Sequence, residues 1–505
     1  MYRHRSVLSM FVMFAVGSVP AATLQDLTHQ PPAPVGLPFL LTDGSVMFQG
    51  NNTATIWFKL TPDETGSYLD GTWTALSSFP NLWNYAPFAF SSAVLADGRV
   101  LVEGGEYNAP EGSFPLTNKG AVYDPVTDQW TQVAPPPGWD HIGDSASIVM
   151  PNGKFLLGDK LTTRVAELDP ATMAWIELGA GGKSDFNAEE GWTLLPDGSF
   201  LTVDVLDAPN TERYVYTDAP GAGGWSSLGP TPQSLAWNYG LAPIMYPGGT
   251  YTPPGETGQC MLRPDRTVFC TGASDDTPAH LAHTAIYSVD SQTWAAGPDF
   301  PPGDDAEDTS AALLPSGHVL VAGVAGTLYE FDGTNLTPMI TNSPGLVITL
   351  PTGEALLSGN TVAIYTPDSE SGADPSWAPT IADAPTTVYL GHSYSISGTQ
   401  FNGLSQAQAL GDELQAPTNY PLVRFVNHAT RRVAYARTHD HTSMGVATGS
   451  TIVSTTFDVP ARMDLGPSDL VVVANGIASQ PVTVNVTVGH SQHAHPASPE
   501  RGRVR

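Results

Sequence analysis

One short pattern recurs seven times along the chain: an apolar strand, a tight turn and a second apolar strand. Clear copies are Val94–Val102, Val149–Leu156 and Leu194–Leu201, whose turns read Ala-Asp-Gly, Pro-Asn-Gly and Pro-Asp-Gly. Pro presets φ at the first turn position, Asp or Asn bonds its own backbone, and Gly takes the left-handed conformation that closes a hairpin. The other copies span residues 41–48, 262–269, 313–320 and 350–356, so successive turns are 36 to 68 residues apart. Repeats of this length predict a propeller or a solenoid.

A second hairpin signature follows most copies, in which an apolar or aromatic strand is joined by a turn to a strand that carries Trp. It is clearest from Ala121 to Trp130, from Ala166 to Trp175 and from Ala285 to Trp294. Two hairpins per repeat make a four-stranded blade, and a ring of blades leaves few exposed sheet edges. The sequence therefore predicts an all-β fold built on a seven-bladed propeller.

These repeats resemble those of kelch-type propellers, whose units pair a double glycine with a downstream Tyr and Trp. The second repeat shows the pattern best, with Gly104-Gly105 followed by Tyr123 and Trp130. Other repeats are degenerate, so the number of blades is better defined than each boundary.

The repeats stop after Tyr365, and a polar connector leads into a region of short alternating strands. The expected strands cover residues 387–390, 394–398, 423–426, 433–437 and 469–477. Several short strands in about 110 residues indicate an immunoglobulin-like β-sandwich. We expect a signal peptide at 1–22, the propeller at 23–375, the sandwich at 376–488, and a disordered tail rich in His and Arg at 489–505.

The chain begins with a basic segment, an apolar stretch too short to span a bilayer, and the small residues Val19-Pro20-Ala21-Ala22, which is typical of a secretory signal. We therefore expect a secreted protein, extracellular or periplasmic. Export permits disulfides, and a three-residue loop at Pro264-Asp265-Arg266 places Cys260 opposite Cys270. That geometry predicts a cross-strand disulfide, with two free thiols as the alternative.

The charge balance narrows the choice of partner. The chain carries 20 Lys and Arg against 49 Asp and Glu, a formal net charge of −29. Phosphate backbones and anionic membrane surfaces repel such a protein. We expect no nucleic acid and no membrane insertion, and a monomer that binds a carbohydrate or another cell-surface component.

The whole arrangement, a kelch propeller followed by a small sandwich, resembles the galactose oxidase and glyoxal oxidase superfamily. The likeness is most specific at residues 401–404, 411–413, 418–424 and 437–445. It implies one copper ion held by two tyrosines and two histidines, one tyrosine being cross-linked to a cysteine. The positions where that pattern would place an axial Tyr-His pair and the sandwich histidine hold Glu307, Asp308 and Gln415 in this sequence.

With the cysteines paired, the cross-linking cysteine is also missing. We therefore predict no cofactor, although copper would be the family cofactor. His439 and His441 are left as an alternative metal pair or as two residues on one face of a strand.

Carboxylates stand just before the inner strands of four successive blades, where propeller chains enter the mouth of the central channel. They are Asp144, Glu189, Glu190, Glu256, Asp304, Asp305, Glu307 and Asp308. Aromatic residues occur in loops of the same kind: Trp83, Tyr85, Trp139, Trp237 and Tyr239.

Several functions fit these residues. Crowded carboxylates suit a hard cation such as Ca²⁺, and aromatic faces stack on sugar rings. Two carboxyls at a defined separation can also act as acid and base on a polysaccharide, and acidic loops can simply solvate an exported protein. We expect a binding or surface module rather than an enzyme. The alternatives are a divergent copper-dependent oxidase of alcohols or aldehydes and a carboxylate-based enzyme acting on polysaccharides.

Overall fold

The computed structural model describes residues 22–489 except 112–113, 179–180, 218–222, 241, 247–248, 253–254, 276, 278, 344, 369–371 and 411–414. The expected signal peptide, apart from Ala22, and the expected tail, apart from Gly489, lie outside these residues. The described part of the chain contains strands and two short 3₁₀ helices, η1 (Asn81–Trp83) and η2 (Pro375–Trp377), and no α-helix. No helix within it is long and apolar enough to cross a bilayer.

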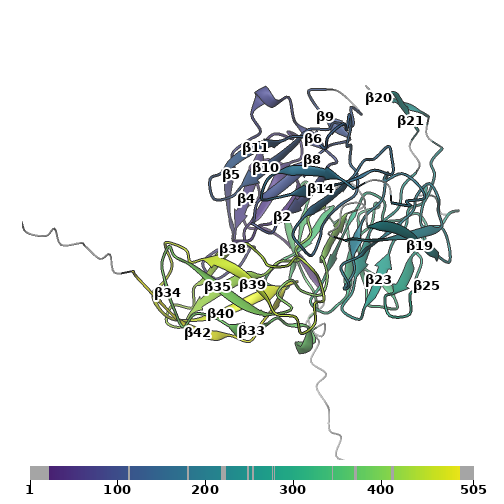
Figure 1. Ribbon diagram of the computed structural model, residues 1–505. Helices are drawn as coiled ribbons and strands as arrows, with labels where there is room; N and C mark the ends of the chain where they lie inside the picture. The colour runs from purple at the N-terminus through teal and green to yellow at the C-terminus, as the bar shows by residue number, and fades with distance from the viewer. Residues whose placement is uncertain are drawn as a thin grey trace, which may run out of the picture.

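Seven antiparallel sheets form the blades of the predicted propeller (Figure 1), and six of them have four strands while the sheet of blade six has a fifth strand, described below. The strands of each blade are given from the inner strand outward. Blade one consists of β2 (Val35–Leu40), β3 (Val46–Gly50), β4 (Trp57–Thr61) and β5 (Thr72–Leu76), and blade two of β7 (Ser91–Val94), β8 (Val100–Glu103), β10 (Gly120–Asp124) and β11 (Gln129–Val133). Blade three consists of β12 (Ser147–Val149), β13 (Phe155–Gly158), β14 (Val165–Asp169) and β15 (Ala174–Glu177). Blades four and five are β16 (Thr193–Leu194), β17 (Phe200–Val203), β18 (Asn210–Val215) and β19 (Gly224–Pro230); and β22 (Cys260–Leu262), β23 (Thr267–Cys270), β24 (Ala285–Ser288) and β25 (Thr293–Ala296).

Blades six and seven are β26 (Ser310–Leu313), β27 (Val319–Ala322), β28 (Thr327–Phe331) and β29 (Leu336–Thr341); and β30 (Leu346–Thr349), β31 (Ala355–Ser358), β32 (Ala363–Thr366) and β1 (Thr23–Asp26). The ring is closed by its first strand, because β1 pairs antiparallel with β32. Two small hairpins stand outside the blades: β6 (Pro87–Phe88) with β9 (Tyr107–Asn108), and β20 (Ile244–Tyr246) with β21 (Gly249–Tyr251).

The two motifs of the repeat have separate structural roles. The inner hairpins place buried aliphatic side chains between blades, and their turn glycines have positive φ, for example 83° at Gly98 and at Gly153. Two outer tryptophans donate hydrogen bonds to the preceding blade through their indole N–H groups. Trp130 donates to Ser77 O at 2.9 Å, and Trp175 donates to Ala134 O at 2.7 Å. Blades two and three are thus each fixed to the preceding blade through the Trp that the repeat supplies.

The predicted disulfide is present. Cys260 on β22 faces Cys270 on β23 in the strand register, and the two sulfur atoms are bonded. It closes the inner hairpin of blade five.

The C-terminal region forms the expected sandwich as one curled sheet in the order β33-β35-β39-β38-β37-β40-β42-β34, with β41 paired to β40. Its strands are β33 (Thr380–Asp383), β34 (Thr387–Tyr389), β35 (Ser393–Thr399), β37 (Leu422–Asn427), β38 (Val433–His439), β39 (Val453–Asp458), β40 (Gly466–Ala474), β41 (Ile477–Ala478) and β42 (Val482–Thr487). The two halves of the sheet enclose their own core, which includes Ile396, Phe425, Phe457, Val472 and Val484.

The sandwich packs on the face of the propeller that carries the turns of the inner hairpins (Figure 1). Gly44 lies against the ring of Tyr435, because a Cβ there would meet the ring carbons at 2.6 to 2.9 Å. Gly353 likewise lies against the sandwich, because a Cβ on Gly476 would lie 3.1 Å from Gly353 Cα. The repeated turn glycines therefore close hairpins and also admit the second domain.

One segment of the sandwich enters the propeller. Strand β36 (Gln408–Leu410) pairs antiparallel with β26, the inner strand of blade six. Gln406 accepts a hydrogen bond from Leu194 N of blade four at 2.8 Å, and Ser92 of blade two donates to Gln415 O at 2.5 Å. Residues 405–410 and 415–418, called the plug below, thus contact several blades at the centre of the ring.

Candidate functional site

The mouth of the channel that lies opposite the sandwich gathers carboxyl groups from five blades, two to six. In each blade the start of the inner strand and the end of the second strand lie on this face, because the two strands are antiparallel. Asp144, Glu189, Glu256 and Asp308 precede inner strands, as the sequence predicted, while Glu106 and Lys160 follow second strands. These six residues are called the mouth cluster below.

Lys160 is the cation of the mouth cluster. Its Nζ lies 2.6 Å from Asp144 Oδ2 and 2.7 Å from Glu189 Oε1, and its side chain is 1% exposed. Asp144 Oδ1 is buried and accepts no hydrogen bond, so one oxygen of that carboxylate has no protein partner. Five carboxyl groups thus surround a single ammonium.

Crowding and burial change the protonation of these carboxyls. Burial, together with the charges of Glu189 and Asp308, raises the pKa of Glu256 to about 10. Burial and the charge of Asp144 raise the pKa of Glu106 to about 8. The pKa of Asp144 and that of Asp308 rise to about 6, mainly through burial, while the Lys160 charge opposes the rise. At neutral pH the cluster therefore holds protons on some carboxyls and negative charge on others.

The mouth cluster has a closed base and an open rim. Asp144, Lys160 and Glu189 are buried, and Glu106 and Glu256 are half-buried. Asp308 is exposed as a residue, while neighbouring protein atoms enclose its carboxyl group. Two members sit in left-handed backbone conformations, with φ of 58° at Glu189 and 43° at Asp308. Such conformations are costly for residues other than Gly and occur often at functional sites.

A second lysine, in blade four, is enclosed instead of open. Lys183 Nζ lies 2.5 Å from Asp185, 2.9 Å from Glu212 and 3.1 Å from Glu190, and all of these side chains are buried. Asp204 is the fourth carboxylate, at 3.6 Å, and the ring of Trp225 covers the ammonium at 5.1 Å. These five charged residues are called the blade-four cage. Glu190 belongs to this cage and not to the channel mouth, which corrects the expectation from the sequence.

The carboxylates of blade six divide into three roles. Asp304 accepts from Tyr329 Oη at 2.6 Å, and Asp305 accepts from Ser274 N at 2.9 Å, so both fix local structure. Glu307 accepts a hydrogen bond from Tyr239, and burial raises its pKa to about 7. Only Asp308 of this group belongs to the mouth cluster.

The expected aromatic rim is partly enclosed. Tyr85 and Trp139 are buried, at 2% exposure each, so neither offers a free face to a sugar. Trp83, Trp237 and Tyr239 are half-buried. The ring of Trp237 packs at a tilt of 38° against that of His280, with centroids 4.6 Å apart, and its backbone pairs with that of Glu256 through two 2.9 Å hydrogen bonds.

The remaining predicted residues lie away from the mouth rim. Gln415 is buried in the plug. His439 bonds Asp440 at 2.8 Å and Asp458 at 3.2 Å, whereas His441 is buried, bonds Thr455 at 2.8 Å and stacks on Tyr420. The two imidazoles therefore have separate partners at the interface between the domains.

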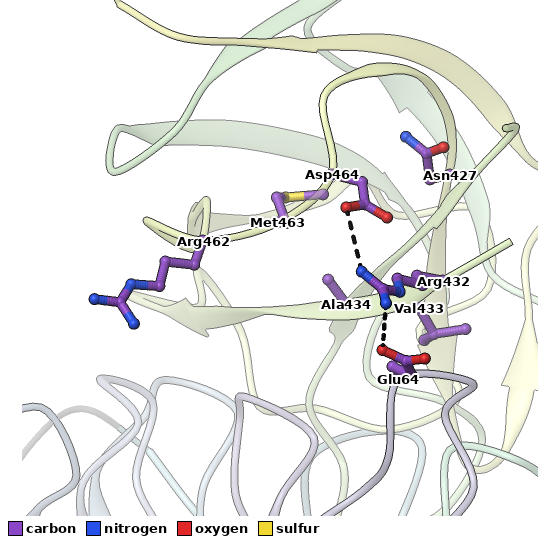
Figure 2. A pocket seen from close by; sticks show the side chains of 8 residues that line it. All are labelled: Glu64, Asn427, Arg432, Val433, Ala434, Arg462, Met463 and Asp464. Carbon is purple, nitrogen blue, oxygen red and sulfur yellow. Dashed lines mark ion pairs between the residues drawn. The ribbon is translucent and has the colours of Figure 1, made fainter. Parts of the chain in front are cut away.

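A groove of about 420 Å³ runs along the seam between the sandwich and blade one (Figure 2). Arg432 in its centre lies 2.9 Å from Glu64 and 3.8 Å from Asp464, while Arg462 points away from this pair (Figure 2). Because Arg432 is already paired with both carboxylates, the groove holds no group comparable with the mouth cluster.

Sequence reasoning missed Lys160, Lys183 and Glu106. One signal was available: the chain has only five lysines, and a lysine directly after the degenerate Gly158-Asp159 is unusual in so acidic a protein. Long charged side chains are almost never fully buried unless paired, so a rare lysine among carboxylates marks an internal ion pair.

The comparisons with known proteins give limited likenesses. No family model matches the chain. The Kelch-like protein terF of Aspergillus terreus is 33% identical over 97 residues, which is 19% of this chain and 20% of that protein, so the match spans a fifth of the relative. The seven blades and this relative confirm the kelch-type resemblance.

Two solved structures are among those that match the chain at low identity. A fungal alcohol oxidase of the AA5 family, in complex with copper, matches with a TM-score of 0.49 and 14% identity, covering 94% of this chain and 100% of that one. Virginiamycin B lyase from Staphylococcus aureus matches with a TM-score of 0.41 and 12% identity, covering 68% and 98%.

Proposed function

We propose that this protein is a cation-binding module whose mouth cluster takes a hard divalent cation such as Ca²⁺. The observation that carries the proposal is the composition of the cluster: it holds five carboxyl groups and one ammonium, which pairs with two of them, while the other three reach the open rim. Hard cations prefer six to eight oxygen ligands, and carboxylates are their strongest protein donors. Glu106, Glu256 and Asp308 would supply the outer ligands.

Calorimetric titration of the purified protein with CaCl₂ at neutral pH tests the proposal. We expect one saturable site, which is lost or weakened at least tenfold in D308N. The matched control is D290N, because Asp290, in the turn between the outer strands β24 and β25 of blade five, pairs with Arg266 in the turn of the inner hairpin, away from the mouth. Absence of saturable heat with Ca²⁺, Mg²⁺ and Mn²⁺ would contradict the proposal.

We further propose that the copper-radical centre of the resembled oxidases is absent here. The side chains gathered at the mouth are five carboxyls, the Lys160 ammonium and Tyr107, which bonds Glu106, and both cysteines form the disulfide of blade five. His141, the imidazole nearest to Lys160 in sequence, is held by Asp159 at 2.9 Å. Such a set does not fit an ion bound by tyrosine and histidine. Peroxide release from alcohols by the protein with stoichiometric copper would overturn this inference.

We propose export on the strength of the disulfide, which persists in oxidising compartments. Detection of the mature protein outside the cytoplasm, with residue 23 as its first residue, is the direct check.

Carbohydrate binding is the second candidate, and Trp237 favours it. This half-buried indole is bonded through its backbone to Glu256, so an aromatic face adjoins the carboxyl cluster. A ring stacked there would place hydroxyl groups near acidic acceptors. Binding of the wild type and of W237A to a glycan array tests this second candidate. Binding that is lost in W237A would support a saccharide ligand.

A further inference from the structure

We infer that Lys160 is the specificity-determining residue of the mouth cluster: its ammonium is a resident cation that competes with an incoming divalent ion for Asp144 and Glu189. The inference rests on the proposed cation binding and adds the residue that limits its affinity.

The surrounding chain is shaped to hold this lysine. Lys160 N donates to Ile142 O at 3.2 Å, which fixes the backbone from which the side chain extends. Gly143 leaves space for the stem, because a Cβ there would lie 3.1 Å from Lys160 Cδ and 3.3 Å from its Cβ. The ammonium is therefore delivered to one place, between Asp144 and Glu189 at the base of the funnel.

The ammonium of Lys160 bonds only one of the two carboxylate oxygens of Asp144. Asp144 is fully buried, yet its Oδ1 accepts no hydrogen bond, while Oδ2 is bound to Lys160. A buried polar atom without a partner is costly and often marks a place for an unseen ion or water. A divalent ion near Asp144 Oδ1 would satisfy this atom and would compete with Lys160.

The blade-four cage shows why the mouth cluster differs from a structural ion pair. Around Lys183 the carboxylates are all buried, and the ammonium already pairs with Asp185, Glu190 and Asp204, whose oxygens lie close enough together to hold a metal ion. Around Lys160 the base is equally buried, but Glu106, Glu256 and Asp308 open to solvent. The same lysine-and-carboxylate chemistry is thus sealed in one blade and accessible at the mouth.

A fixed positive charge beneath the open carboxylates repels any cation that they bind, and it occupies two oxygens that the ion would use. Removal of the charge, with the side-chain volume retained, is therefore expected to tighten Ca²⁺ binding at least tenfold. An arginine at the same position keeps the charge and is expected to bind Ca²⁺ no better than the wild type.

The experiment is calorimetric titration of CaCl₂ into the full secreted chain as wild type, K160M, K160Q and K160R. K160Q retains hydrogen-bond donors for Asp144 and Glu189, so it keeps the test available if K160M fails to fold. The control is K154M, which removes the same charge from the same blade at the hairpin turn that faces the sandwich, where Lys154 pairs with Glu167 at 2.5 Å.

Tighter binding by K160M or K160Q, with K154M and K160R unchanged or weaker, supports the inference. If the wild type binds Ca²⁺ and both neutral variants bind it with equal or weaker affinity, the inference is overturned and the proposed function is left intact. Binding only in the neutral variants supports the role of Lys160 and overturns cation binding by the native protein. Absence of binding in every variant overturns both.

Discussion

Glu189 and Glu190 are neighbours in the chain, yet their carboxylates serve two different lysines. Glu189 Oε1 lies 2.7 Å from Lys160 at the channel mouth, whereas Glu190 Oε1 lies 3.1 Å from Lys183 inside blade four. The left-handed backbone at Glu189, with φ of 58°, accompanies this divergence. One dipeptide therefore links the open cluster to the sealed cage.

The sealed cage is expected to be a major contributor to the stability of blade four. Replacement of Lys183 by Met leaves buried carboxylates without their cation, so we predict a loss of about 3–5 kcal/mol in the free energy of unfolding. K154M, which breaks a partly exposed pair, is expected to cost less than about 1 kcal/mol. Chemical denaturation of both variants makes the comparison, and equal small losses would show that the cage contributes little.

Stability is expected to fall as pH rises through the neutral range. A Glu carboxyl in the unfolded chain releases its proton near pH 4.5, whereas Glu106 and Glu256 hold theirs up to pKa values of about 8 and 10. The folded state then binds more protons than the unfolded state, and the linkage makes unfolding easier as pH increases. We predict a lower Tm at about pH 9 than at about pH 6.

The same pH series in E256Q separates the cluster from general effects of charge. This variant lacks the titrating group, so its Tm should depend less on pH than that of the wild type. E354Q, at the hairpin turns that face the sandwich, should follow the wild type. An unchanged slope in E256Q would contradict the assigned protonation of Glu256.

The disulfide of blade five should stabilise the folded protein through its effect on the unfolded chain. Cys260 and Cys270 are 10 residues apart, and closing a loop of this size is worth about 2–3 kcal/mol. We predict that the C260A/C270A variant has a lower Tm in differential scanning calorimetry. A reductant should lower the Tm of the wild type and leave that of the variant unchanged; insensitivity of both to reduction would contradict this role.

The plug is expected to contribute to the free energy of unfolding through its contacts between the two domains. Gln406 Oε1 accepts from Leu194 N at 2.8 Å in a buried position, so Q406A leaves that amide without a partner. We predict a loss of about 1–3 kcal/mol. Q129A, which changes an exposed glutamine on an outer strand, serves as the control in urea denaturation, and equal midpoints for the two variants would refute the role of the plug.

The features that could be predicted from the sequence are those that depend on residues close together in the chain. The turn motifs are local, so they defined seven inner hairpins, and the ten-residue spacing of the cysteines defined their facing register. The positions of Asp144, Glu256 and Asp308 followed from alignment of the blades on those turns. Such predictions need only the rule that equivalent positions in a propeller lie on one face.

The parts that were missed depend on contacts between distant elements. Lys160 and Glu106 reach the mouth from the ends of second strands, which the alignment on inner strands did not include. The carboxylate of Glu190 lies inside blade four, where it pairs with Lys183. Tyr85 and Trp139 are buried by residues from distant parts of the chain. The direction of a side chain at a loop depends on its partners, which a single sequence does not reveal.

The central claim is that the carboxyls at the channel mouth bind a divalent cation, and anomalous diffraction from crystals soaked in Mn²⁺ tests it most directly. We predict one anomalous peak within coordination distance, about 2–2.6 Å, of carboxylate oxygens of Glu106, Glu256 or Asp308. An anomalous map without a peak at the mouth, or with its peak at another carboxylate group of the protein, would contradict the claim.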